Sequence, residues 1–213
     1  MTIPKGLYGI TPDWDNFDKV IEAVRVACEA GLPILQFRRK KEEPYKLRLE
    51  QCKRIRDICL RENTLFIVND SIQLAMDSQA DGVHLGREDI VYRDIATTYA
   101  LERGNFVIGY SCYNSLDMAR DAVKNGASYI AFGAMYPSPT KPNAVKADTN
   151  LIKEAKKEFV DIPIVCIGGI TLQNALPLIE AGADNVAVIT GLFESEDIAK
   201  AVREFKNLFE HWK

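Results

Sequence analysis

The chain has 213 residues, of which 47% are hydrophobic and 27% are charged, and its formal net charge is −3. This composition is that of a folded globular protein and excludes a disordered chain. The small negative charge gives no basis for general attraction to nucleic acid or to anionic membranes, so an anionic ligand would require a local cluster of bases.

The five cysteines indicate free thiols rather than a disulfide framework. Their number is odd, none falls in a C-x-x-C pair, and most lie in apolar strand or helix patterns, as buried thiols do. The N-terminal sequence MTIPKGLYGITPD has no apolar segment of the kind found in signal peptides, and no stretch approaches eighteen apolar residues. We therefore expect a cytoplasmic protein with reduced cysteines.

Short apolar runs, typical of buried strands, recur along the chain. They are LYGIT at 7–11, ILQF at 34–37, LFIV at 65–68, GVHL at 82–85, FVIGY at 106–110, YIAFG at 129–133, IVCIG at 164–168 and VAVIT at 186–190. The segments between them carry helical spacing, as in Phe17, Val20, Val24 and Ala27. Phrases such as EAGLPILQF and EAGADNVAV place a helix stop just before a strand.

Eight strands that alternate with amphipathic helices predict a parallel sheet covered by helices. Eight such units in 213 residues fit a small (β/α)8 barrel, or TIM barrel, that forms one α/β domain over residues 1–213. A doubly wound open sheet is the alternative, although it would normally have fewer strands and a Gly-rich first turn. In a barrel, functional residues are expected just after the carboxyl ends of the strands.

Two acidic residues follow neighbouring predicted strands. Asp70 comes after the strand at 65–68, and Asp89 comes after the strand at 82–85. Each is also a common type of helix cap, and capping is the simpler interpretation of either residue alone. Adjacent barrel strands, however, would place both carboxylates on one rim within reach of a single Mg²⁺.

Basic residues follow the second predicted strand in the sequence QFRRKKEE. Because side chains alternate in an extended segment, Arg38 and Lys40 should lie on the same side as Gln36, toward the barrel mouth. A solvated charge run before a helix is the alternative. His84, inside the fourth strand, is expected to be a hydrogen-bonded core residue rather than a metal ligand.

The loops after the last three strands suggest anion binding. The sixth, GAMYPSPTKPNA, is stiffened by three prolines and carries Ser138, Thr140 and Lys141. The seventh and eighth carry Gly168-Gly169 and Ile189-Thr190-Gly191, where backbone N–H groups can approach a phosphate. Tight turns are the alternative, but two such loops together favour a phosphate site. Two anion sites in turn favour a diphosphate and a monophosphate as substrates.

With these motifs in order, the chain resembles the thiamine-phosphate synthase family over nearly its whole length. The resemblance lies in LYGIT, QFRRK, NDSIQLAMDSQADGVHLGRED, IGYS, YPSPTK, IGGI and GADNVAVIT, which occur in the family's order and spacing. It implies a transferase of thiamine biosynthesis that joins 4-amino-5-hydroxymethyl-2-methylpyrimidine diphosphate to a thiazole phosphate and releases pyrophosphate. In the family's dissociative mechanism, the pyrimidine methylene becomes a carbocation that the thiazole nitrogen captures.

The resemblance also implies a role for each matching residue. The pyrimidine diphosphate would bind to Gln36, Arg38, Lys40, Asn69, Ser111 and Lys141, of which Arg38, Lys40, Lys141 and Ser111 would act in catalysis. Mg²⁺ would be held by Asp70 and Asp89, and the thiazole phosphate by Ser138, Thr140, Gly169, Ile189 and Thr190. The sequence has no Ser-His-Asp or Cys-His arrangement, so it gives no support for a covalent enzyme intermediate.

The sequence departs from the family pattern at a few positions. Ser138 stands where the family commonly has threonine, and Thr190 stands where it commonly has serine, so both positions keep a hydroxyl. Ala134 replaces a common proline. Tyr113 replaces a frequent histidine on which the related thiazole tautomerases rely. A tautomerase-like isomerase is the alternative function, and Tyr113 argues against it. We expect small-molecule substrates, with no nucleic-acid or membrane partner; the number of subunits stays open, with a homodimer as the working expectation.

Overall fold

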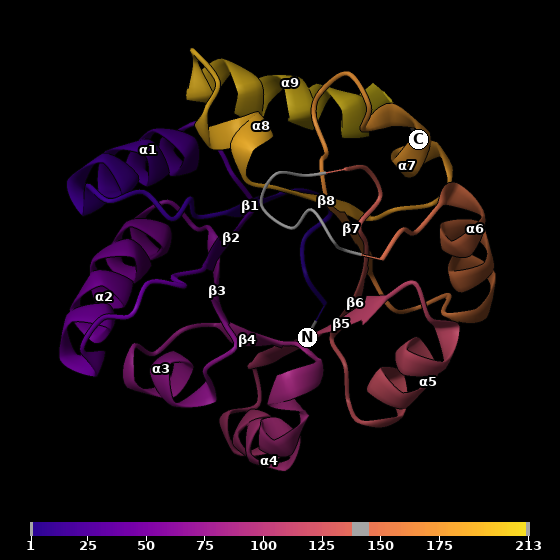
Figure 1. Ribbon diagram of the computed structural model, residues 1–213, viewed down its shortest axis with the longest axis horizontal. Coiled ribbons are helices and arrows are strands. Elements are labelled where there is room, and N and C mark those ends of the chain that lie inside the picture. Colours follow the sequence, from indigo (N-terminus) through magenta and orange to yellow (C-terminus); the bar gives the residue numbers. More distant parts are fainter. Residues whose placement is uncertain (1, 138–144, 212–213) are drawn as a thin grey trace.

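The computed structural model describes residues 2–137 and 145–211, which form a closed barrel of eight parallel strands in sequential order (Figure 1). The strands are β1 Gly6–Ile10, β2 Ile34–Phe37, β3 Leu65–Asn69, β4 Gly82–Leu85, β5 Val107–Tyr113, β6 Tyr129–Phe132, β7 Ile164–Ile167 and β8 Asn185–Val188. All eight predicted strands are confirmed. The largest difference is at β5, which continues three residues beyond the predicted end.

Helices surround the barrel in a single ring (Figure 1). They are α1 Phe17–Glu29, α2 Tyr45–Arg61, α3 Ile72–Asp77, α4 Arg93–Arg103, α5 Leu116–Lys124, α6 Thr149–Glu158, α7 Leu176–Glu180, α8 Thr190–Phe193 and α9 Ile198–His211, with a 3₁₀ helix, η1, at Arg87–Tyr92. The (β/α)8 prediction is therefore correct, and the open doubly wound sheet is excluded by the pairing of the first strand with the last.

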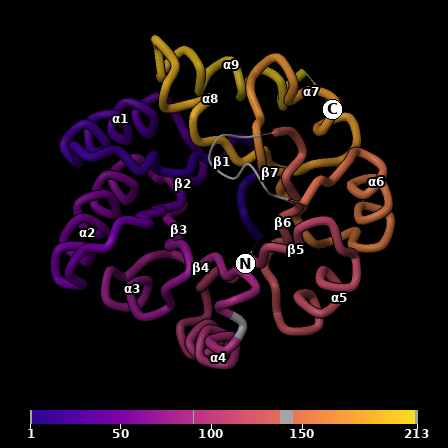
Figure 2. The backbone as a smooth tube through the Cα atoms, viewed as in Figure 1, coloured from indigo at the N-terminus to yellow at the C-terminus, as the bar shows by residue number. Residues whose placement is uncertain are grey.

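That pairing closes the ring. Leu7 of β1 lies opposite Val186 of β8, and Tyr8 lies opposite Ala187. In Figure 2 the chain runs once around the barrel, so the indigo N-terminal helix α1 lies beside the yellow C-terminal helix α9. As a result, each strand's carboxyl end has neighbours on both sides, and all the βα loops meet at one rim.

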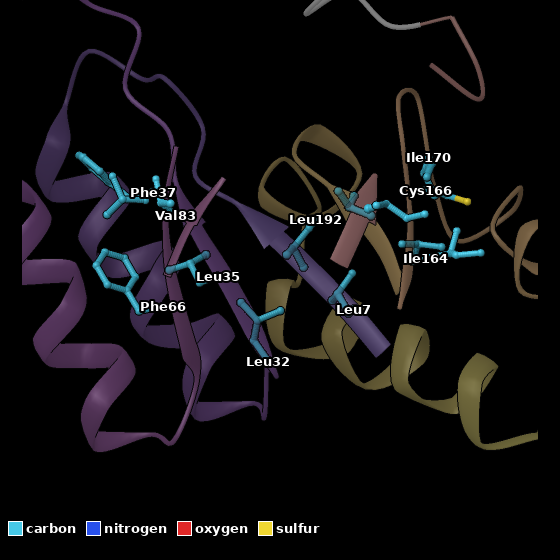
Figure 3. Close-up of a cluster of buried hydrophobic side chains, with 14 of the residues drawn as sticks. Leu7, Leu32, Leu35, Phe37, Phe66, Val83, Ile164, Cys166, Ile170 and Leu192 are labelled. Atoms are coloured by element: carbon cyan, nitrogen blue, oxygen red, sulfur yellow. The ribbon is translucent and has the colours of Figure 1, made fainter. Parts of the chain in front are cut away.

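The alternation of side chains along the strands produces two separate cores. One fills the barrel interior and contains inward-facing residues such as Tyr8, Ile67 and Val165. The other lies between the strands and the helices and contains outward-facing residues such as Leu35 and Phe66 (Figure 3). The parity of a residue in its strand therefore decides whether its side chain can reach the barrel mouth.

All five cysteines are free and buried, in agreement with the expectation of reduced thiols. Over the described residues, the longest apolar helix falls short of what is needed to cross a membrane.

Candidate functional site

The loop after β2 carries the basic residues that the sequence singled out. Thr11, buried just after β1, fixes the loop by accepting a hydrogen bond from the Arg38 N–H at 2.9 Å and donating to the Arg38 carbonyl at 3.1 Å. Arg39 is buried and pairs with Glu43 at 2.6 Å and Asp13 at 3.2 Å. Arg38 is half-buried, whereas Lys40 is exposed and its ammonium contacts the Asp70 carboxylate.

Asp70 is not a helix cap, so the capping interpretation of this residue is wrong. The cap of α3 is Ser71, whose Oγ accepts from the Leu74 N–H at 3.2 Å. Asp70 lies one residue earlier with φ of +66°, a left-handed conformation, and its N–H donates to the His84 carbonyl at 2.8 Å. This backbone geometry turns its carboxylate onto the rim, where the Lys40 ammonium contacts it.

Asp89 does not cap a helix at residue 90 either. It lies within the 3₁₀ helix η1, and α4 begins only at Arg93. Its Oδ2 accepts from the Gly86 N–H at 2.9 Å, a contact that stabilises the start of η1. The helix start that the sequence suggested at residue 90 therefore lies inside η1.

The two acidic side chains meet across the rim. Partial burial and the contact with the Asp70 carboxylate both raise the pKa of Asp89, although the Gly86 N–H acts in the opposite direction. Two carboxylates in contact repel each other unless a cation lies between them. The structure therefore brings together the pair that the sequence proposed as metal ligands.

These donors suit Mg²⁺. Within residues 2–137 and 145–211, no cluster of three or more His, Cys, Asp or Glu side chains could hold a metal. Mg²⁺ commonly binds through one or two carboxylates, while water and substrate phosphate oxygens complete its coordination. A pair of carboxylates open to the mouth fits that requirement, whereas a Zn²⁺ site would need more protein ligands.

A chain of polar side chains runs through the upper barrel interior. Gln36 donates from Nε2 to the Tyr8 hydroxyl at 2.9 Å, and the Tyr8 and Tyr129 hydroxyls lie 2.8 Å apart. The Tyr129 hydroxyl lies 2.9 Å from His84 Nδ1, and His84 Nε2 lies 2.9 Å from Ser111 Oγ. The chain thus connects two predicted substrate-binding residues, Gln36 and Ser111, and confirms His84 as a hydrogen-bonded core residue.

The loops after β7 and β8 pack closely together. Gly168 and Gly169 have φ of +106° and +60°, and a Cβ on Gly169 would lie only 2.4 Å from the Pro137 carbonyl oxygen. A Cβ on Gly191 would lie 2.7 Å from the Ile170 carbonyl oxygen. Only glycine permits these approaches, so Gly169 packs against the end of the described β6 loop, and Gly191 of the β8 loop packs against Ile170 of the β7 loop.

A pocket of about 360 Å³ adjoins Asp70. Lys40, Asn69 and Asp70 contribute to its lining, together with Arg48 of α2. The Arg48 Nε is buried and has no hydrogen-bond partner in the described part of the chain. Sequence reasoning missed Arg48, because nothing distinguishes it from the other charged residues of α2 before the helix is docked.

Tyr113 occupies the other side of the acidic pair. It has φ of +53°, and the Arg87 guanidinium lies over its ring at 5.0 Å from the ring centroid. A Cβ on Gly86 would approach both the Asp89 carboxylate and the Tyr113 hydroxyl, which places Tyr113 at the rim. The predicted site residues Ser138, Thr140 and Lys141 lie outside the described residues.

Known proteins resemble the chain over nearly its whole length. The family model described as thiamine monophosphate synthase matches residues 7–192. Thiamine-phosphate synthases from Bordetella bronchiseptica and Nitrosomonas eutropha are 43% and 45% identical to the chain; the matches cover 95% and 96% of it and 94% of each relative. The structure of a thiamine phosphate pyrophosphorylase from Pyrococcus furiosus superposes with a TM-score of 0.83 at 33% identity, covering 97% of this chain and 96% of that one. The chain belongs to the thiamine-phosphate synthase family.

Proposed function

We propose that this chain condenses 4-amino-5-hydroxymethyl-2-methylpyrimidine diphosphate with 4-methyl-5-(2-phosphoethyl)thiazole, or its 2-carboxy form, to give thiamine phosphate and pyrophosphate, with CO₂ released in addition from the carboxy form. The observation that carries the proposal is the pair of facing carboxylates, Asp70 and Asp89, with the Lys40 ammonium against Asp70. Two negative side chains beside positive ones suit a ligand that brings its own negative charge and a bridging cation.

The pyrimidine diphosphate would bind between the loops after β2, β3 and β5. In this assignment Gln36 and Ser111, at the top of the barrel interior, hold the pyrimidine ring, and Asn69 contacts the substrate from the end of β3. Arg38, Lys40 and Lys141 neutralise the diphosphate. The support for the described part of this assignment is that Arg38 is half-buried at the mouth and that, among the described residues, no carboxylate pairs with it.

Mg²⁺ would be held by Asp70 and Asp89. When bound, the ion supplies positive charge that stabilises the pyrophosphate as it departs. The ammonium of Lys40 and the guanidinium of Arg38 act on the same leaving group from fixed positions. Preorganised charge of this kind is usually the largest contribution to catalysis, and loss of one such donor costs about 10²–10³ in rate.

The thiazole phosphate would bind at the loops after β6, β7 and β8. Its ligands in this assignment are Ser138, Thr140, Gly169, Ile189 and Thr190. The close approach of the loops supports the described part of this set, because a Cβ at Gly169 would collide with the β6 loop at Pro137 and a Cβ at Gly191 would collide with the β7 loop at Ile170. The monophosphate and the diphosphate would then lie at opposite sides of the mouth.

The reaction needs no covalent intermediate on the protein. The C–O bond between the pyrimidine methylene and the diphosphate breaks, and both electrons leave with the pyrophosphate. The lone pair of the thiazole nitrogen then forms the new C–N bond to the methylene cation. Because that nitrogen carries no proton to be removed, the site requires positive charge and shielding from water rather than a general base.

An isomerase of the tautomerase type is not favoured. The curated relatives named above are thiamine-phosphate synthases, and Tyr113 stands where the tautomerases have their histidine. We further propose that the enzyme is a single catalytic domain that works in the cytoplasm, in line with its free, buried thiols. A homodimer remains our expectation for its assembly.

The experiment that tests the function is an assay of the purified protein with both substrates, with and without Mg²⁺, in which thiamine phosphate is detected directly. We expect product only when both substrates and Mg²⁺ are present. Conversion of the 2-carboxy thiazole alone to an isomer would instead identify a tautomerase. Absence of thiamine phosphate with either thiazole form would overturn the proposal.

A further inference from the structure

In the polar chain of the barrel interior, each hydrogen bond has a donor and an acceptor, and the family assignment does not specify which group is which. Its five members come from five different strands: Tyr8 from β1, Gln36 from β2, His84 from β4, Ser111 from β5 and Tyr129 from β6. All except Ser111 are at least nine-tenths buried. Buried hydroxyl and imidazole groups must satisfy one another, so the proton positions along the chain are linked.

The direction can be followed from Gln36. Its Nε2 donates to the Tyr8 hydroxyl, so the Tyr8 proton is available for the Tyr129 oxygen 2.8 Å away. The Tyr129 oxygen then accepts one hydrogen bond, and its own proton faces His84 Nδ1 at 2.9 Å. Burial raises the pKa of both tyrosines, so each keeps its single proton to donate.

With the Gln36 NH2 group facing the Tyr8 hydroxyl, the opposite arrangement would leave a proton without an acceptor. If His84 Nδ1 carried the proton, the Tyr129 oxygen would accept from both Tyr8 and His84. Its own proton would then need a third partner, and the described residues supply only these two. An unsatisfied buried hydroxyl costs roughly 1–3 kcal/mol. The directed chain from Gln36 to His84 avoids that cost.

We propose that this chain of hydrogen bonds holds His84 as the neutral tautomer with its proton on Nε2. His84 thereby makes Ser111 a hydrogen-bond donor toward the substrate. With Nε2–H donating to Ser111 Oγ at 2.9 Å, the Ser111 proton is released from His84 and can face the barrel mouth. In the other tautomer the serine proton would face His84, and Ser111 could offer a ligand only its lone pairs. Tyr8, Tyr129 and His84 are therefore positioning residues, and this part of the inference rests on the substrate-binding role proposed for Ser111.

The shape of the barrel is adapted to this chain. The Tyr129 ring crosses the interior beside Gly109 of β5, and a Cβ on Gly109 would lie 2.0 Å from the ring. The ring meets Tyr8 edge-on at a centroid distance of 5.9 Å and stacks on His84 at 5.6 Å. Gly109 thus makes room for Tyr129, whose hydroxyl joins the Gln36–Tyr8 pair to the His84–Ser111 pair.

The tautomer can be measured without any substrate. The protein has only two histidines, His84 and the exposed His211, so an ¹⁵N-labelled sample carrying His211→Gln gives the ring nitrogen signals of His84 alone. We expect the proton on Nε2 in the otherwise wild-type protein and loss of that preference in Tyr129→Phe. A proton on Nδ1 in the wild type, or an unchanged tautomer in Tyr129→Phe, would overturn the proposal.

A double-mutant cycle tests the link to the substrate. Tyr129→Phe should lower kcat/KM for the pyrimidine diphosphate about 10-fold, the effect of one lost hydrogen bond. In a Ser111→Ala background the same change should have no further effect beyond about twofold, because Tyr129 acts through Ser111. Independent, multiplicative losses would refute the coupling.

The matched control is Tyr110→Phe. It removes a buried hydroxyl from the same region, but Tyr110 faces the helices, and its hydroxyl has no hydrogen-bond partner in the described residues. The control should keep both the His84 tautomer and kcat/KM. If the tautomer is as expected but no thiamine phosphate forms, the proposed function fails while the proton arrangement stands. If Tyr129→Phe does not fold, the wild-type tautomer still decides the proposal.

Discussion

Replacing Asp89 with asparagine separates the structural role of this residue from its proposed metal-binding role. The substitution removes one of two facing charges, yet it keeps the size of the side chain and an oxygen that can accept from the Gly86 N–H at 2.9 Å. We therefore expect Asp89→Asn to fold normally. Any change in stability should come from the lost charge rather than from a lost cap or cavity.

Without metal, the variant should be slightly more stable than the wild type. Two unit charges about 4 Å apart repel by roughly 4 kcal/mol at an effective dielectric constant near 20, before any compensation. The Lys40 ammonium offsets part of this repulsion, and the side chains are partly exposed. We therefore expect a net gain of about 0.5–1 kcal/mol, which for a chain of this size raises Tm by about 1–4 °C.

With metal, the order should reverse. A ligand at about 100 times its Kd stabilises the folded state by roughly 2.7 kcal/mol, so Mg²⁺ with pyrophosphate should raise the wild-type Tm by about 5–10 °C. Asp89→Asn should show little of this shift and should lose about 10²–10³ in the rate of thiamine phosphate formation. Differential scanning calorimetry and the two-substrate assay measure the two effects.

Glu88→Gln is the control, because Glu88 is an exposed acid on the same 3₁₀ helix. It should match the wild type both in its response to Mg²⁺ with pyrophosphate and in activity. The reasoning is refuted if Asp89→Asn responds to Mg²⁺ with pyrophosphate as strongly as the wild type. It is equally refuted if the metal-free variant is markedly less stable, since the carboxylate would then have a structural function.

Three further substitutions test other parts of the site. Gly109→Ala should cost about 1–3 kcal/mol in urea unfolding, because its Cβ would lie 2.0 Å from the Tyr129 ring; a neutral effect would mean that the ring is free to move. Gly169→Ala, at φ of +60° and with a Cβ 2.4 Å from the Pro137 carbonyl oxygen, should raise KM for the thiazole phosphate at least about 10-fold while the pyrimidine diphosphate KM changes little. Arg39→Ala should cost roughly 3 kcal/mol in urea unfolding because it leaves two partly buried carboxylates unpaired, and a loss below 1 kcal/mol would show that the loop does not depend on it.

The fold could be predicted from the sequence because the barrel repeats one simple pattern. Runs such as ILQF and GVHL are short, continuous and apolar, and both match their strands at each residue. The alternation rule also predicts that Gln36 and Phe37 face opposite sides of β2, and in the structure Gln36 bonds to Tyr8 in the barrel interior while Phe37 packs on the helices. These features depend only on local sequence and on the period of a strand.

The details of the rim could not be predicted in this way. Taken one at a time, Asp70 and Asp89 are most simply interpreted as helix caps, whereas in the structure Ser71 is the cap of α3 and Asp89 lies inside a 3₁₀ helix. The choice between Asp70 and Ser71 depends on the left-handed backbone of Asp70, which is fixed by its hydrogen bond to β4. Such a contact exists only after the strands are paired.

The interior polar chain was missed for the same reason. Tyr8 and Tyr129 are 121 residues apart, and in the sequence each is simply an aromatic residue of an apolar run. Their hydroxyls meet because β1 and β6 face each other across a closed barrel whose interior is narrow. An alternating pattern assigns both side chains to the interior, but it cannot state which of the inward residues touch.

The two halves of the proposed pyrimidine diphosphate site are joined at a single residue of β4. The His84 carbonyl accepts the Asp70 N–H at 2.8 Å and so stabilises the left-handed turn that directs the carboxylate to the rim. The His84 ring, on the same residue, contacts Ser111 and Tyr129 in the interior. Because a paired strand cannot shift without breaking its ladder, the barrel fixes the end of β3, and with it the Asp70 backbone, relative to β4 and β5. If the substrate spans Ser111 and Asp70 as proposed, both of its contacts are therefore positioned by the same residue of β4.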